Sequence, residues 1–233
     1  MIKLENVETM GWEAAIRGMR NPMNSWEKSD SECLFHVVPN YSYDDPKAEE
    51  YTRYLDDYNL NLKLGPNDYA LMMKLANAGP VHGKFRRMIT VYVDITAPLY
   101  WWKEFDTYKV GTVANSCSTM HKIAEKEFTL EDFSCEHLFH TRPLEYIIEV
   151  LNTQRTLYNN TPTTEEKLRK AYWWQMIQLL PSSYNQKRTV MLNYEVLANI
   201  YKYRKNHKLD EWVELCKWIE TLPYSELITG GND

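Results

Sequence analysis

The chain has 233 residues and a mass of 27.7 kDa, and its 44% apolar content is ordinary for a protein with a packed core, which excludes a disordered chain. Its 27 Lys and Arg stand against 32 Asp and Glu, and the net charge of −5 disfavours bulk nucleic-acid binding. No stretch approaches the ~18 consecutive apolar residues of a membrane span. The first 20 residues carry three glutamates instead of a basic and then apolar signal. We therefore expect a cytoplasmic protein without a membrane partner.

Cysteine and aromatic usage narrow the class further. The four cysteines are widely scattered and form no C-x-x-C pair, a pattern typical of reduced thiols rather than of a disulfide framework. The 17 Tyr and 8 Trp are numerous, and some are adjacent, as in Trp101-Trp102. Such aromatic surface is typical of a thick core, of subunit contacts or of a pocket for a planar ring.

The first hundred residues carry the strand signal. Asp45-Pro46 offers a helix cap and a first-turn proline before Tyr and Leu residues at helical spacing, and the preceding residues 21–44 indicate a loop. A second helix is predicted over 67–78, ended by Gly79-Pro80. Residues 87–96 alternate and are rich in β-branched side chains, so they predict the clearest strand of the chain.

Helical spacing dominates the remainder. The expected helices are an aromatic one over 100–110 after Pro98, one over 144–151 after Pro143, one from the capping box Thr163-x-x-Glu166 to Pro181, one marked by Val190, Tyr194, Leu197 and Tyr201, and one marked by Trp212, Leu215, Cys216 and Ile219. No linker divides the chain. We therefore expect a single α+β domain over 1–233, with a small sheet and a large helical layer.

Two short segments gather chemically active side chains, and each can be interpreted as a functional site or as ordinary protein surface. The segment 135–140 holds one Cys and two His, which zinc accepts, but no fourth ligand completes a site, so we predict no metal. The segment 82–87 sets His82, a flexible glycine and three cations just before the strand, and by itself this is typical of a basic loop. No glycine-rich phosphate loop, nucleophile elbow or H-E-x-x-H motif occurs.

Asn193 and Arg204 lie eleven residues apart, close to three helical turns. One helix face can therefore present an amide and a guanidinium together, a pair suited to a carbonyl or a phosphate. The alternative is that Arg204 ends the helix and binds its own last carbonyls.

The order of features from Leu75 to Lys122 resembles the flavin-dependent thymidylate synthases. The family's Arg-His-Arg triplet falls on Thr107-Tyr108-Lys109, its two serines on Thr112 and Cys117, and its final Arg-Tyr on Thr119-Met120. A second block from Leu179 is also similar. There Leu180-Pro181, Asn193, Asn199 and Arg204 keep their places, whereas Glu195 replaces the arginine of Asn-x-Arg-Ser. Beside a phosphate this last change exchanges attraction for repulsion.

The resemblance implies a thymidylate-synthase-like fold and a homotetramer that binds FAD and dUMP at subunit junctions. In that family the flavin carries a methylene group from methylenetetrahydrofolate to dUMP and supplies a hydride taken from NADPH. The implied cofactor-binding residues here are His82, Arg87, Lys109 and Asn199, and the implied substrate-binding residues are Thr112, Cys117, Asn193 and Arg204. The sequence identifies no catalytic residue.

Three hypotheses follow. The first is a divergent flavin-dependent thymidylate synthase, or a related flavin enzyme, that binds FAD and a uridine or deoxyuridine nucleotide. The second is a catalytically inactive nucleotide-binding or protein-interaction scaffold on the same fold. The third is an unrelated helical scaffold, which would make the resemblance from Ala97 to Met120 a coincidence.

Overall fold

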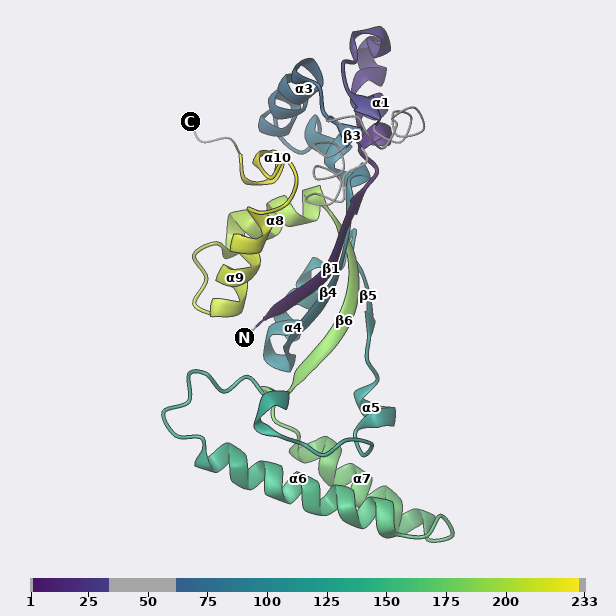
Figure 1. Cartoon of the computed structure of the whole chain (residues 1–233), viewed down its shortest axis with the longest axis vertical. Coiled ribbons are helices and arrows are strands. Elements are labelled where there is room, and N and C mark those ends of the chain that lie inside the picture. The colour runs from purple at the N-terminus through teal and green to yellow at the C-terminus, as the bar shows by residue number, and fades with distance from the viewer. Residues whose placement is uncertain (1, 34–61, 231–233) are drawn as a thin grey trace, which may run out of the picture. The chain divides into compact units, whose positions relative to one another are not determined.

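The computed structural model describes residues 2–33 and 62–230 (Figure 1). Its strands are β1 (Lys3–Met10), β2 (Glu32–Cys33), β3 (Leu62–Lys63), β4 (Thr90–Pro98), β5 (Val113–Ser116) and β6 (Asn185–Asn193). Its helices are α1 (Trp12–Arg20), α3 (Pro66–Asn77), α4 (Leu99–Phe105), α5 (Thr119–Lys122), α6 (Arg142–Asn160), α7 (Glu166–Leu179), α8 (Tyr194–Arg204), α9 (Asp210–Ile219) and α10 (Glu226–Thr229). A small antiparallel sheet has the order β1-β4-β6-β5, and β2 pairs with β3. The fold is therefore α+β, as predicted.

The chain divides into two compact units. The α6/α7 unit comprises Met1–Leu4, Asp94–Thr107 and Ala114–Thr189. The α8 unit comprises Glu5–Val93, Tyr108–Val113 and Val190–Asp233. Among the residues that the structure describes, no helix is long and apolar enough to cross a membrane.

The core of the α6/α7 unit lies where α6 and α7 pack side by side (Figure 1). This core consists of apolar side chains of α6 and α7 and of apolar and aromatic residues that precede α6. They are Ile123, Ala124, Phe128, Phe133, Leu144, Ile148, Leu151 and Met176. In the same unit α4 buries Trp101, Trp102 and Phe105. The indole N–H of Trp102 donates to the carbonyl of Gln186 at 3.0 Å, so this buried polar group is satisfied.

The core of the α8 unit is built on α8 and α9. One face of each helix is buried, and the side chains that it buries include Tyr194, Leu197, Ile200, Trp212 and Ile219. Trp12 of α1 meets Tyr194 edge to face, with ring centroids 5.3 Å apart. Helices α1 and α8 are therefore joined by aromatic packing.

A buried carboxylate in the first turn of α3 organises the start of the α8 unit. Asp68 is fully buried and accepts hydrogen bonds from Arg20 Nε at 2.6 Å and from the hydroxyls of Ser29 and Ser31, both at 2.7 Å. The backbone N–H groups of Asp30 and Ser31 also donate to it. Burial alone would raise the pKa of Asp68, but the hydrogen bonds from Ser31, Ser29 and Arg20 outweigh it and lower that pKa. The carboxylate thus ties α1, α3 and residues 29–31 together.

The strand predictions needed correction. Residues 87–89 are not strand, because residues Gly83–Met88 form a 3₁₀ helix and β4 begins at Thr90. Val190 belongs to β6 and not to the helix that was expected there, which begins only at Tyr194. Strands β5 and β6 also contradict the expectation that the sheet lies within the first hundred residues. In these stretches, strand pairing between distant segments outweighed the local sequence pattern in setting the secondary structure.

The other helix predictions that fall on described residues are confirmed, with two differences in their bounds or caps. The aromatic helix ends at Phe105 and gives way to a 3₁₀ turn, so it is shorter than expected. The capping box at Thr163 is wrong, because Glu165 is the N-cap of α7 and makes no side-chain cap hydrogen bond with any residue that the structure describes. The helix predicted after Asp45-Pro46 lies outside the described residues.

Candidate functional site

Arg204, the last residue of α8, is half-buried beside two aromatic rings. Its Nε donates to the hydroxyl of Tyr108 at 3.0 Å, and its guanidinium carbon lies 4.7 Å from the ring centroid of Trp212. The rings of Tyr108 and Trp212 meet edge to face at 5.8 Å. Stacking and the hydrogen bond hold the guanidinium in place, and a fixed guanidinium can recognise a phosphate or a carbonyl with directed hydrogen bonds.

Asn193 stands at the other end of α8. Its side-chain oxygen accepts from the Val196 N–H at 3.0 Å as the N-cap of the helix, and its Nδ2 donates to the Gly111 carbonyl at 3.4 Å. Gly111 has φ +81°, and a Cβ there would lie 3.0 Å from Asn193 Nδ2, so the close approach requires glycine. The amide of Asn193 therefore has a structural role in the chain.

The segment 108–112 and helix α8 thus meet at two points, one at each end of the helix. These are the two sequence blocks on which the resemblance rested. Within the same segment Lys109 is exposed, and Thr112 is half-buried. The buried hydroxyl of Thr112 has no hydrogen-bond partner among the described residues. This hydroxyl can therefore still donate a hydrogen bond to a water or to a ligand atom.

A pocket of about 330 Å³ opens on another face of α8. The charged and amide side chains that line it are Asn77, Arg86, Glu195, Asn199, Lys202 and Lys205, and α10 contributes Leu227, Ile228, Thr229 and the following Gly230. We call it the α8 pocket. Its volume is within the range of small-molecule sites. Of the eight candidate site residues, Asn199 alone is among the described residues that line it.

The α8 pocket contains a buried ion pair. Arg86 Nη2 lies 2.7 Å from Glu195 Oε2, and both side chains are about 10% exposed, at 11% and 10%. Arg86 Nη1 also donates to the Leu227 carbonyl at 3.2 Å. Arg86 Nε is buried and has no hydrogen-bond partner in the part of the chain that the structure describes. The negative charge of Glu195 is therefore balanced within the protein, which offsets the repulsion expected from the sequence.

Tyr201 lines the same pocket and donates to Glu220 Oε1 at 2.7 Å. This hydrogen bond and partial burial raise the pKa of Tyr201 to about 12. The phenol is therefore protonated at neutral pH and serves as a hydrogen-bond donor, not as a general base.

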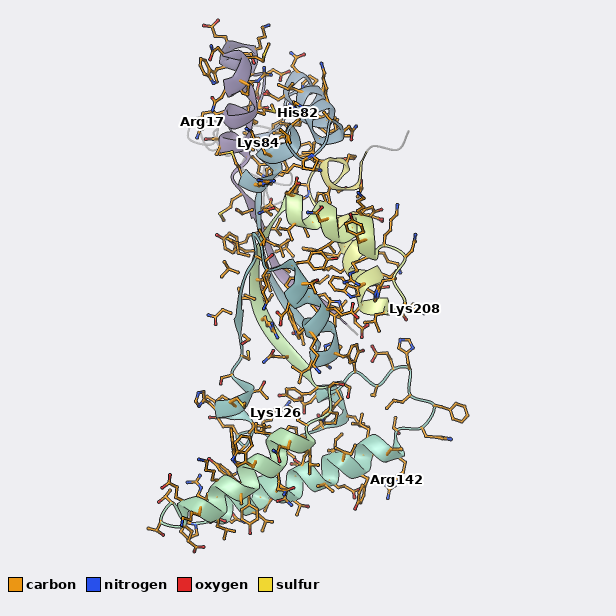
Figure 2. All side chains as sticks on the ribbon, turned by 180° about the vertical axis from the view of Figure 1, so that it is seen from behind. Arg17, His82, Lys84, Lys126, Arg142 and Lys208 are labelled. Carbon is orange, nitrogen blue, oxygen red and sulfur yellow. The ribbon has the colours of Figure 1, made fainter. Side chains whose placement is uncertain are left out.

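The remaining candidates are exposed. His82 precedes the 3₁₀ helix Gly83–Met88, and Arg87 lies within it. Figure 2 shows His82 and Lys84 on this part of the ribbon. Cys117 belongs to the α6/α7 unit, where its N–H donates to the Lys187 carbonyl. Among the described residues, no group of three or more His, Cys, Asp or Glu side chains is placed to hold a metal ion.

Sequence reasoning missed several residues that the structure places at these sites. Lys202 and Lys205 follow Asn199 at intervals of three, so helical spacing offered a signal for a shared face. Trp212 carried no such signal, because its approach to Arg204 depends on the packing of α9 against α8.

Comparisons with solved structures show the same fold in nucleotide enzymes. Thymidylate synthase X from Helicobacter pylori, solved with FAD and dUMP, matches with a TM-score of 0.64 and 14% identity over 99% of this chain and 98% of that chain. A second structure of the Helicobacter pylori flavin-dependent enzyme, complexed with FAD and dUMP, matches with a TM-score of 0.61 and 14% identity over 97% and 98% of the two chains. The UMP/dUMP methylase PolB from Streptomyces cacaoi, bound with 5-Br dUMP, matches with a TM-score of 0.54 and 11% identity over 98% and 95%.

No family model and no curated protein sequence matches the chain significantly. The structural likeness spans nearly the whole of each chain, so the fold is that of the flavin-dependent thymidylate synthases. At this identity the likeness concerns the fold, and function has to be argued from the site.

Proposed function

We propose that the protein binds FAD and a uridine or deoxyuridine nucleotide, and that it methylates dUMP with methylenetetrahydrofolate and NADPH as a homotetramer. The observation that carries the proposal is the meeting of segment 108–112 with α8. It unites the two resembling blocks, on a fold whose solved examples hold FAD and dUMP.

The residues present are chemically suited to both ligands. The pyrophosphate of FAD needs cations and hydrogen-bond donors, and the α8 pocket offers Arg86, Lys202, Lys205 and the amide of Asn199. The buried Arg86 Nε, which lacks a hydrogen-bond partner among the described residues, is an available donor there. When bound, FAD would supply the redox and carbon-transfer chemistry.

The nucleotide would be held at the end of α8. Arg204 is oriented by Tyr108 and Trp212 and would bind the phosphate or a carbonyl of the base. The Thr112 hydroxyl would donate to an oxygen of the nucleotide, whereas Lys109 would supply charge to FAD. Exposed His82 and Arg87 would contact the flavin, and Cys117 the nucleotide, once subunits assemble.

Flavin binding is the first test. The freshly purified protein should be scanned for the visible absorbance bands of flavin, before and after addition of FAD and desalting. Retained flavin and a tetramer by light scattering are expected, followed by dUMP methylation with methylenetetrahydrofolate and NADPH. A protein that retains no flavin and does not bind dUMP would overturn the proposal in favour of the non-catalytic scaffold.

The second test addresses the nucleotide site. Arg204→Ala should weaken dUMP binding by about 1–3 kcal/mol, because a charge-assisted hydrogen bond is lost. Calorimetric titration measures the affinity, and circular dichroism checks the fold. The matched control is Lys208→Ala, which removes an exposed cation of the same unit (Figure 2) and should leave the affinity unchanged. Unchanged dUMP affinity in folded Arg204→Ala would remove this residue from the site.

A further inference from the structure

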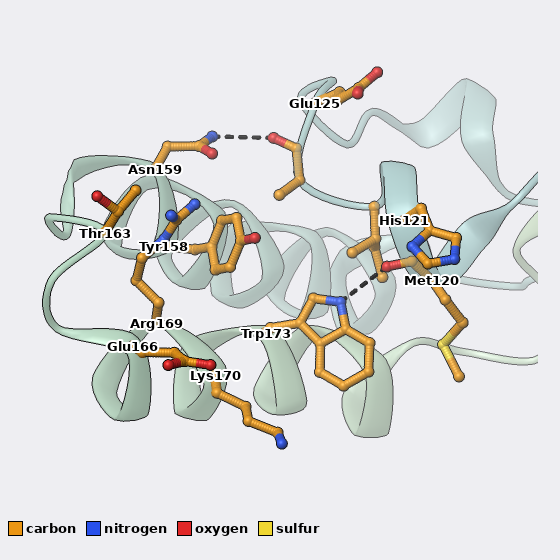
Figure 3. A pocket seen from close by; sticks show the side chains of 12 residues that line it. Met120, His121, Glu125, Tyr158, Asn159, Thr163, Glu166, Arg169, Lys170 and Trp173 are labelled. Carbon is orange, nitrogen blue, oxygen red and sulfur yellow. Dashed lines mark hydrogen bonds between the residues drawn. The ribbon is translucent and has the colours of Figure 1, made fainter.

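A second, larger pocket lies in the α6/α7 unit. It has a volume of about 920 Å³ and is bounded by the segment Met120–Glu125 on one side and by α6 and α7 on the other (Figure 3). We call it the α6/α7 pocket. None of the eight candidate site residues is among the described residues that line it. Its chemistry is therefore separate from the proposed FAD and nucleotide contacts.

Two aromatic rings form part of its wall. The indole N–H of Trp173 donates to the Met120 carbonyl at 2.9 Å, which fixes this half-buried ring between α7 and the facing segment. Asn159 at the end of α6 donates in the same way to the Ala124 carbonyl at 3.0 Å. Figure 3 shows both bonds. The bonds hold the two sides of the pocket together and place the ring of Trp173 in the pocket wall, where it can stack on a planar ligand.

A guanidinium with an unused donor lies beside these rings. The guanidinium carbon of Arg169 is 4.4 Å from the centroid of the Tyr158 ring, so the side chain stacks on it (Figure 3). Arg169 Nε is buried, and no described residue accepts a hydrogen bond from it. Buried donors are nearly always satisfied, so this atom indicates where an acceptor on a ligand would bind.

The other charges limit the ligand. Lys170 also lines the pocket, and its side chain extends away from Arg169 in Figure 3, so it adds a second, more distant cation. Of the two lining carboxylates, Glu125 is paired with Lys122 outside the pocket lining, whereas Glu166 stands one turn before Lys170 on α7. Glu166 would repel a ligand with several negative groups. The balance of the lining charges therefore favours a ligand with a single anionic group.

We propose that the α6/α7 pocket binds a small ligand in which a planar aromatic ring is joined to one carboxylate or phosphate group. The ring stacks on Trp173. The anionic group accepts a hydrogen bond from Arg169 Nε, and Lys170 adds attraction at longer range.

The test is calorimetric titration of the full chain with 4-hydroxybenzoate and with AMP, which represent the carboxylate and phosphate sources. At least one probe should bind saturably, and adenosine should bind about 10-fold more weakly than AMP if phosphate is the source. Arg169→Gln should weaken binding about 10-fold, and Lys170→Gln about three- to fivefold, because Lys170 acts at longer range. Glu166→Gln should tighten it severalfold, because a repulsive charge is removed.

The matched control is Lys167→Gln, an exposed position of α7 that does not line the pocket in the described structure. It should leave the affinity within about twofold. Thermal unfolding verifies that each variant folds. If Arg169→Gln does not fold, the affinity of Lys170→Gln tests the proposal instead. Absence of saturable binding by both probes below about 1 mM would overturn the proposal, as would equal losses in Lys167→Gln and Lys170→Gln.

Two further measurements separate this site from the proposed function. Probe affinity should be unchanged in Arg204→Ala and in the presence of saturating dUMP. Displacement of the probe by dUMP together with loss of probe binding in Arg204→Ala would assign the probe to the nucleotide site and overturn the inference.

Discussion

Two buried arginine–carboxylate pairs of the α8 unit differ in how completely they are satisfied. Asp68 receives hydrogen bonds from Arg20, two hydroxyls and two backbone N–H groups. Arg20 also donates to the carbonyls of Ser25 and Lys28, so the whole network is closed. The Arg86–Glu195 pair instead lines a pocket and leaves the buried Arg86 Nε without a partner among the described residues.

The number of hydrogen bonds that each pair receives distinguishes a structural ion pair from one that is available to a ligand. Each pair is costly to bury, and only additional hydrogen bonds offset the loss of water. A closed network has no capacity left for a ligand and acts by joining chain segments. An open pair beside a cavity retains a donor, so the same residue types serve a different purpose.

The largest expected effect is at the closed pair. Asp68→Asn should lower the free energy of unfolding by about 3–5 kcal/mol, because Arg20 would remain buried with an uncompensated charge. Urea unfolding measures the loss. The matched control is Glu13→Gln, which removes the exposed Glu13–Arg17 pair and should cost less than about 1 kcal/mol. A similar loss in both variants would show that the buried network is not special.

At the open pair we expect a smaller loss of stability together with a gain in anion affinity. Glu195→Gln should lower the free energy of unfolding by about 1–3 kcal/mol, because Arg86 keeps its hydrogen bond to Leu227. The freed guanidinium should at the same time bind anions more tightly. Urea unfolding and titration with FAD measure the two effects. A loss of stability as large as that of Asp68→Asn, with no gain in FAD affinity, would contradict the distinction between the pairs.

The smallest expected effect is the acid dependence of the closed pair. The folded pKa of Asp68 lies below its ordinary value of 3.8, so the unfolded chain takes up the proton first as the pH falls. The stabilisation is therefore fully present above the ordinary value and is lost as the pH falls through the lowered folded pKa. Unfolding followed between pH 5 and 2 should show a shallower decline for Asp68→Asn than for the unaltered chain. Parallel declines would place the acid sensitivity elsewhere.

The amino-acid sequence by itself determined the helices with strong local signals and the order of the two resembling blocks. α3 ends before its Gly79-Pro80 stop signal, and α6, α7 and α9 follow their apolar spacing, because these signals act within a few residues. The candidate residues Asn193, Asn199 and Arg204 also followed from position in the sequence, and the structure places them on or beside one helix.

Only the tertiary structure decided β6, the partners of Glu195 and the two pockets. Val190 fits a helical stripe locally, yet it lies in a strand because the sheet supplies partners from distant segments. Glu195 looked like a repulsive charge until Arg86, more than a hundred residues earlier, was found against it. Such contacts depend on loop closure and packing between remote segments, and no local pattern of residues encodes them.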